Sequence, residues 1–167
     1  MSTSASILEF PAQVERVSPD GAQHFFGYYD KCPWNASGRY LLAHATTVEN
    51  RLLRPEDEVT VGLIDLAAGR DFRPLGRTAA WYWQQGAMLQ WWPGEPEHTI
   101  LYNVRGPEGL GCVIQDIRTG STRPLPLPVA AVSRDGTKAL SINFARLARE
   151  RPGYGYEGVA DPFAAED

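Results

Sequence analysis

The sequence has few cysteines, no excess of basic charge and no long hydrophobic run. Its two cysteines, Cys32 and Cys112, match neither a metal-site spacing nor a dense disulfide framework, so both are expected to be reduced thiols. The net charge of -4 offers no positive field to nucleic acid. No apolar stretch is long enough to cross a bilayer, and the N-terminus lacks a basic segment followed by a long apolar one. We therefore expect a cytoplasmic protein without nucleic-acid or membrane partners.

The common catalytic signatures are also missing. The chain contains no Ser-His-Asp order, no glycine-rich loop that cradles phosphate and no zinc-binding HExxH pattern. We expect neither a metal site nor a cofactor, and the sequence leaves open whether the protein is an enzyme.

The residues that are present indicate a folded chain of short elements. Hydrophobic residues make up 43% of the 167 residues and charged residues 22%, which is ordinary for one globular domain. The 16 glycines, 13 prolines and 11% aromatic residues predict many turns and disfavour a helical bundle. This composition is typical of a β protein.

An internal repeat sharpens that prediction. Residues 35–38 (Asn-Ala-Ser-Gly) and 133–136 (Ser-Arg-Asp-Gly) are turns before apolar strands, and residues 63–69 align with residues 114–120. Repeats of about 40 to 50 residues with four short strands are typical of propeller blades. We predict an all-β fold with about three four-stranded antiparallel blades, an incomplete β-propeller. A small β-sandwich is the alternative.

The repeat divides the chain into three regions. Residues 1–23 form an irregular lead with a possible outer strand at residues 13–17, and residues 24–150 form the blades. Residues 151–167 are an acidic, partly disordered tail or the start of another blade. The last blade, around residues 138–144, would present an unpaired edge and apolar surface. The expected partners are therefore further propeller blades or a second copy of the chain.

Three stretches carry a resemblance to known propellers. The turn at residues 133–136 resembles the WD40-like, TolB-type bacterial β-propeller repeat. Residues 24–31 (HFFGYYDK) and 151–156 (RPGYGY) are similar to a group of bacterial propeller proteins and, more loosely, to oligogalacturonate lyases. The resemblance implies an N-terminal fragment of a longer propeller. Those lyases are implied to use histidines and a divalent metal, but this sequence has no matching histidine cluster.

The loops on one face of the predicted blades carry aromatic, amide and guanidinium groups. Aromatic rings can stack on a sugar, and arginines can hold a carboxylate by paired hydrogen bonds. The candidate ligand-binding residues are Tyr28, Tyr29, Trp83, Gln84, Gln85, Asn103, Arg105, Asn143 and Arg146. Arg149 and Arg151 have the same chemistry, and His24 and His44 are a possible base or ligand. The alternative is structural: internal salt bridges or hydrogen bonds are the commoner role of a single arginine or histidine, and core packing explains the aromatic residues as simply as ligand binding does.

Two functions fit this candidate face. The first is binding of a small acidic ligand, above all an acidic saccharide, within a polysaccharide lyase-like protein. The second is a non-catalytic propeller scaffold that binds a protein partner, because aromatic residues and arginines are typical of interface hot spots.

Overall fold

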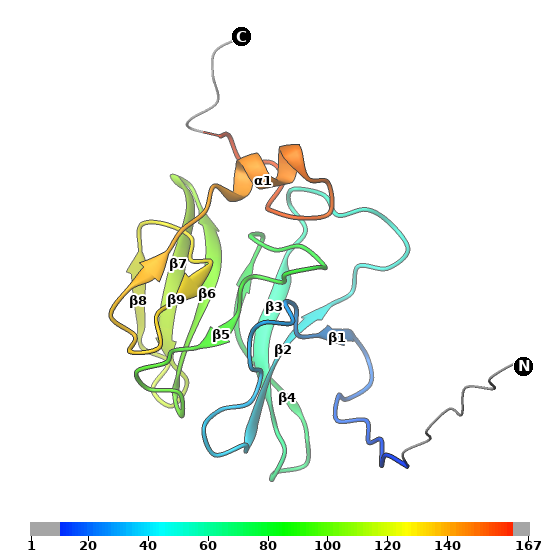
Figure 1. Ribbon diagram of the computed structural model, residues 1–167. Coiled ribbons are helices and arrows are strands. Elements are labelled where there is room, and N and C mark those ends of the chain that lie inside the picture. Colours follow the sequence, from blue (N-terminus) through cyan, green and yellow to red (C-terminus); the bar gives the residue numbers. More distant parts are fainter. Residues whose placement is uncertain (1–10, 162–167) are drawn as a thin grey trace, which may run out of the picture.

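The computed structural model describes residues 11–161 and is built mainly from two four-stranded antiparallel sheets (Figure 1). The first sheet contains β1 (Gln23–Phe25), β2 (Tyr40–Thr46), β3 (Val59–Asp65) and β4 (Phe72–Thr78). The second contains β5 (Gln90–Trp91), β6 (Thr99–Gly106), β7 (Gly109–Asp116) and β8 (Thr122–Leu125). A hairpin of β9 (Ala131–Val132) and β10 (Ala139–Leu140) follows, and then the helix α1 (Phe144–Glu150).

The all-β prediction is confirmed, and the strand order in each sheet follows the chain. Within the described residues no sheet closes on itself. The strand β1 ends at Phe25, because the chain turns at Gly27 with φ +121°. The possible outer strand at residues 13–17 does not form.

The repeat is visible in the hydrogen bonds of the turns. The backbone N–H of Tyr40 donates to the Asn35 side chain at 2.8 Å, and the N–H of Lys138 donates to the Ser133 hydroxyl at 2.9 Å. In both turns the first residue also donates its N–H to the carbonyl five positions later. The turns at residues 35–38 and 133–136 are therefore equivalent, although their first side chains differ.

The second sheet is covered on both of its faces. Ile100 on β6 belongs to the large core between the two sheets, together with Val61 and Leu63 of β3. The next residue, Leu101, points the other way and packs with Cys112 and Val129 in a separate cluster. Three layers therefore follow one another: the first sheet, the second sheet and the segment that leads into β9.

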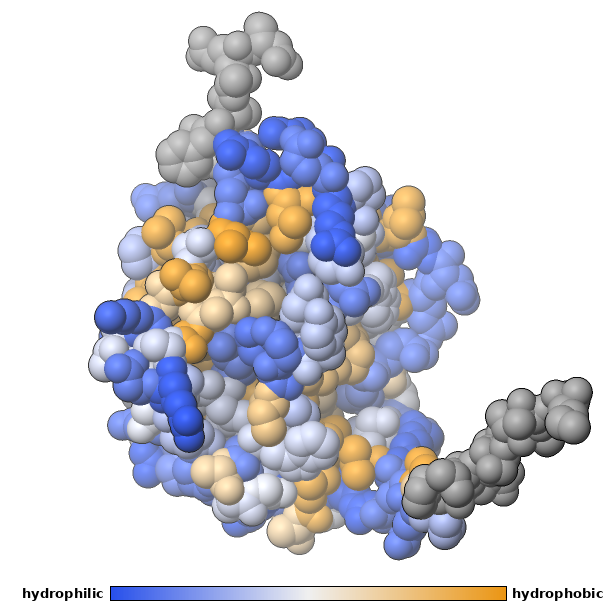
Figure 2. Space-filling view, viewed as in Figure 1, coloured by the Kyte–Doolittle hydropathy of each residue, from blue (hydrophilic) through white to orange (hydrophobic). Residues whose placement is uncertain are grey.

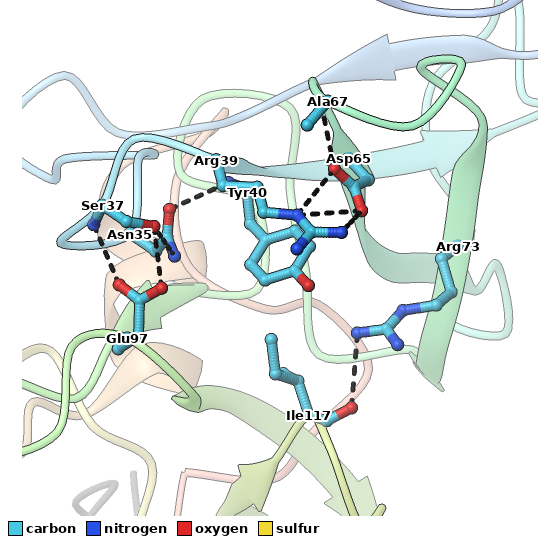
Figure 3. A network of polar contacts seen from close by, with 9 residues as sticks. All are labelled: Asn35, Ser37, Arg39, Tyr40, Asp65, Ala67, Arg73, Glu97 and Ile117. Carbon is cyan, nitrogen blue, oxygen red and sulfur yellow. Dashed lines mark hydrogen bonds and ion pairs between the residues drawn. The ribbon is translucent and has the colours of Figure 1, made fainter.

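Tight turns at one end of the sheets tie the first layer to the second (Figure 3). The hydroxyl and the backbone N–H of Ser37 both donate to the carboxylate of Glu97, at 2.7 and 2.9 Å. Farther along the same end, Arg73 of β4 donates to the carbonyl of Ile117 at 3.3 Å. These contacts join turns that are 60 and 44 residues apart in the sequence.

The segment after β10 departs from the prediction. The strand expected over residues 138–143 is limited to Ala139–Leu140, and Phe144–Glu150 forms α1 within the region predicted to consist of blades. The Asn143 side chain caps this helix by accepting a hydrogen bond from the N–H of Arg146 at 2.9 Å. After the helix the chain folds back, and the Tyr156 ring stacks on Phe144 with 4.5 Å between centroids. Residues 162–167 of the predicted tail lie outside the described residues.

Candidate functional site

Three loops come together away from the tight turns: residues 26–31 after β1, residues 82–86 before β5, and residues 151–156 after α1. A Cβ added to Gly27 would lie 2.9 Å from the carbonyl oxygen of Gln85, so the first two loops are in direct contact. The side chain of Gln85 then accepts a hydrogen bond from the N–H of Gly155 at 3.3 Å. Gln85 is therefore buried between the other two loops.

The first loop presents two tyrosines to solvent. The rings of Tyr28 and Tyr29 are stacked, with 4.9 Å between centroids and 23° between planes. Tyr29 is 84% exposed, while Tyr28 is half-buried. An exposed, stacked ring pair is a flat apolar surface with a polar rim, which suits contact with another ring.

The third loop adds an arginine and a further tyrosine. The guanidinium carbon of Arg151 lies 3.9 Å from the ring centroid of Tyr154. Both residues are close enough to affect Tyr28: burial raises the pKa of Tyr28, the neighbouring Tyr29 and Tyr154 raise it further, and the positive charge of Arg151 opposes the rise. Among the described residues, no carboxylate forms an ion pair with Arg151. We call Tyr28, Tyr29, Arg151 and Tyr154 the tyrosine–arginine surface.

His44, a predicted base or ligand, lies in the core under the second loop. Its ring stacks on Phe25 at 4.8 Å, and its Nε2 accepts the N–H of Ala87 at 3.0 Å. A Cβ on Gly86 would collide with the imidazole, so only glycine fits above it. Burial lowers the pKa of His44 to about 4, and the nearby backbone of Phe25 and Phe26 only partly opposes this shift. His44 is therefore a neutral structural residue with no access to solvent.

Asn103 is also fully buried, in the middle of β6. Its side-chain oxygen accepts the N–H of Val129 at 2.7 Å, and its amide nitrogen donates to the Val129 carbonyl at 3.1 Å. The same nitrogen donates to the hydroxyl of Tyr156 at 3.0 Å. Instead of contributing to the predicted rim, Asn103 pairs the second sheet with the segment that leads into β9.

Arg105 is bound by the backbone of two other segments. Its guanidinium donates to the carbonyl of Pro55, at 2.5 Å, and to the carbonyl of Glu157. Burial lowers the pKa of this guanidinium. The Arg105 side chain holds the loop between β2 and β3 against Glu157. Few of its N–H groups are therefore left to bind an anion.

Asn143 and Arg146 surround a carboxylate supplied by the chain itself. The side chain of Asp161 is only 4% exposed, and it accepts from Asn143 at 2.6 Å and from Arg146 at 2.9 Å. Arg149 lies 3.4 Å from the same carboxylate. The sequence predicts that Asn143 and Arg146 bind a ligand, whereas in the structure they bind the carboxylate of Asp161.

Three further predicted residues are Trp83, Gln84 and His24. Trp83 is half-buried and packs on Phe25 and Trp81 at the margin of the core, whereas Gln84 is exposed at the tip of its loop. His24 lies within β1 and not in a loop, and its ring meets Phe72 edge-on at 5.0 Å. Among the candidates that lie in the three loops, Tyr29, Gln84 and Arg151 are exposed, and Tyr28 and Trp83 are half-buried.

A separate groove of about 760 Å³ opens between the β6–β7 turn, the start of α1 and the end of the described chain. Its walls are largely apolar and include Leu110, Leu127 and Ile142. Arg105 and Asn143 are among the residues that line this groove, whereas none of the four residues of the tyrosine–arginine surface lines it.

The described residues contain no group of three or more histidines, cysteines or acidic residues that could hold a metal ion. Nor does any helix among them have the length and apolar character needed to cross a membrane; the cytoplasmic location stays a prediction. No protein-family model, no curated protein and no solved structure matches this chain.

The sequence analysis noted Arg151 only as one of several arginines and did not include Tyr154. Both belong to the glycine-rich stretch at residues 151–156, where Gly153 and Gly155 have φ of +95° and +77°. Such a run of glycines between aromatic residues indicates a tight, ordered turn. That pattern was available in the sequence, but its position beside Tyr28 was not.

Proposed function

We propose that this chain belongs to a β-propeller-type module. Each four-stranded sheet is made from consecutive strands, whereas sandwiches of the immunoglobulin type pass strands between their two sheets. The second sheet is buried on both faces, as a blade between two neighbours is. On this view β9 and β10 are the first two strands of a third unit.

We also propose that the module binds an acidic saccharide on the tyrosine–arginine surface. The observation that carries this proposal is the guanidinium of Arg151. It has no carboxylate partner among the described residues, and it lies beside the exposed Tyr28–Tyr29 ring pair. The rings would stack on the sugar, and Arg151 would hold the sugar's carboxylate by charged hydrogen bonds.

The two arginines that the sequence suggested as ligand-binding residues, Arg105 and Arg146, are already bound within the protein. Arg105 already donates to two carbonyl oxygens, and Arg146 already binds Asp161. Moving Arg105 to a ligand would break both of its hydrogen bonds, and moving Arg146 would remove one partner of the Asp161 carboxylate, at a cost of about 1.5–3 kcal/mol for each charged hydrogen bond. Arg151 can bind a ligand without that loss.

The proposal is tested by calorimetric titration of the full chain with an oligogalacturonate and with a neutral oligosaccharide of equal length. We expect binding of the acidic ligand and much weaker binding of the neutral one. Arg151→Gln should weaken binding of the acidic ligand by roughly 10- to 100-fold, the scale of one charged hydrogen bond.

The matched control is Arg134→Gln. Arg134 is also exposed, and its replacement removes the same charge, but it lies in the turn at residues 133–136. We expect less than about a twofold effect there, because surface charges far from a ligand are screened by salt. Equal affinity for both sugars, or equal effects of the two substitutions, would contradict the proposal and favour the scaffold function.

A further inference from the structure

Neither outer edge of the β9–β10 hairpin is paired with another described strand, and the edge of β10 is the exposed one. Each of the other two sheets has four strands, whereas this one has two. Residues 137–142 are all exposed, including Leu140 at 70% and Ile142 at 45%. Figure 2 shows hydrophobic side chains gathered beneath α1, over the region of β9 and β10. Exposed apolar edge strands are prone to pair with another chain.

The direction of the backbone groups is fixed by the bonds to β9. The carbonyls of Lys138 and Leu140 accept from Ser133 and Ala130, both at 2.8 Å. Because backbone groups alternate along an extended strand, we infer that the N–H and C=O of Ala139 point toward the uncovered edge, and that those of residue 141 join them when β10 lengthens by one residue on pairing. These groups form the hydrogen-bonding row of an additional strand.

From these observations we propose that β10 pairs antiparallel with β10 of a second copy of the chain. The result is a four-stranded sheet in the order β9–β10–β10–β9, with as many strands as each of the other sheets. A twofold axis relates two antiparallel strands, so one surface complements itself without any other partner. This inference concerns a different surface from the saccharide site and does not depend on it.

The alternation of backbone groups selects one register. Ala139 and Ser141 of one copy face Ser141 and Ala139 of the other and exchange hydrogen bonds, so Leu140 faces Leu140 across the axis. This central pair is of the non-hydrogen-bonded type, in which side chains approach most closely. Lys138 then lies opposite Ile142 of the other copy, which keeps like charges apart and lets the lysine stem cover the isoleucine. The contact removes the exposed Leu140 and Ile142 of both copies from water.

A cysteine at the axis tests the register directly. In a Cys32→Ser background, which removes the exposed free thiol, Leu140→Cys should form a disulfide-linked dimer under mild oxidation. Paired Cα atoms in such a register lie about 4.5 Å apart, within the range that a disulfide bridges. The control is Leu52→Cys in the same background, since Leu52 is 83% exposed but lies in the loop between β2 and β3. We expect at least tenfold faster cross-linking at residue 140.

Sedimentation of the unmodified chain, at loading concentrations from about 1 to 100 µM, gives an independent measurement. We expect a shift from the 18.5 kDa monomer toward a species of twice that mass. Leu140→Lys should abolish the shift while circular dichroism stays unchanged, because the side chain is mostly in solvent. A monomer at every concentration, or equal cross-linking at residues 52 and 140, would overturn the proposal. A dimer that survives Leu140→Lys would place the interface elsewhere and also overturn it.

Discussion

At the scale of single residues, polar side chains in this protein are mostly used to hold segments together. His44, Asn103 and Arg105 each bind backbone groups of a distant segment. Buried backbone groups need partners, and a side chain that reaches across supplies them where no strand pairs. The chemistry that makes such residues attractive as ligand-binding candidates therefore serves the fold instead.

His44 makes the folded protein sensitive to acid. In the unfolded chain it takes up a proton near pH 6.5, but in the folded protein only near pH 4. Between these values the unfolded state binds more protons, so the free energy of unfolding falls as the pH drops from 6.5 to 4. The difference corresponds to about 3 kcal/mol, all of it present above pH 6.5. Urea unfolding of the wild type and of His44→Gln, followed across this range, measures it. The variant should lack this part of the pH dependence; parallel curves would refute the assignment.

At the scale of elements, the capping of α1 decides how the chain continues after β10. A helix of seven residues is unstable alone in water and depends on its caps and its packing. Here the Asn143 side chain caps the helix and also donates a hydrogen bond to the buried Asp161 carboxylate. Phe144 packs on Tyr156. The first turn of the helix is thus stabilised both by its cap and by the packing of Phe144.

Asn143→Ala should loosen this element. The substitution removes both the cap and the bond to Asp161, at a cost of about 1 kcal/mol for the cap alone. We expect faster hydrogen exchange across residues 144–156 and little change in β2 and β3. Asn143→Ser keeps a capping oxygen and should recover most of the protection. If alanine and serine exchange alike, the cap does not stabilise the helix.

At the scale of the whole molecule, the layered packing predicts that core residues on the two faces of the second sheet contribute equally to the free energy of unfolding. Ile100 faces the first sheet and Leu101 faces the segment before β9, and both are fully buried. Replacing either by alanine should lower the free energy of unfolding by about 2–5 kcal/mol. Thr122→Ala on the exposed β8 should change it by less than about 0.5 kcal/mol. A small effect at Leu101 would mean that only one face of the second sheet is covered in solution.

Much of the fold was predictable from the sequence because it depends on local chemistry. The turns at residues 35–38 and 133–136 use side chains that bond to their own backbone, and those bonds determine where strands begin. The central strands β2, β3, β6 and β7 follow, since their apolar residues form continuous runs between turns. The strand ends were less predictable: Gly27 adopts positive φ where it lies against the backbone of Gln85, a contact that depends on the fold.

The sequence by itself determined the all-β class, the repeat and the kinds of side chain available for a site. Only the tertiary structure decided which of those side chains are free. Arg146 and Arg151 are five positions apart and chemically identical, yet Arg146 binds the buried carboxylate of Asp161 while Arg151 lies on the half-buried ring of Tyr154. Whether a guanidinium meets a carboxylate depends on which distant segments pack beside it. The pairing of a guanidinium with a carboxylate is decided by the fold of the whole chain, and a local sequence pattern does not predict it.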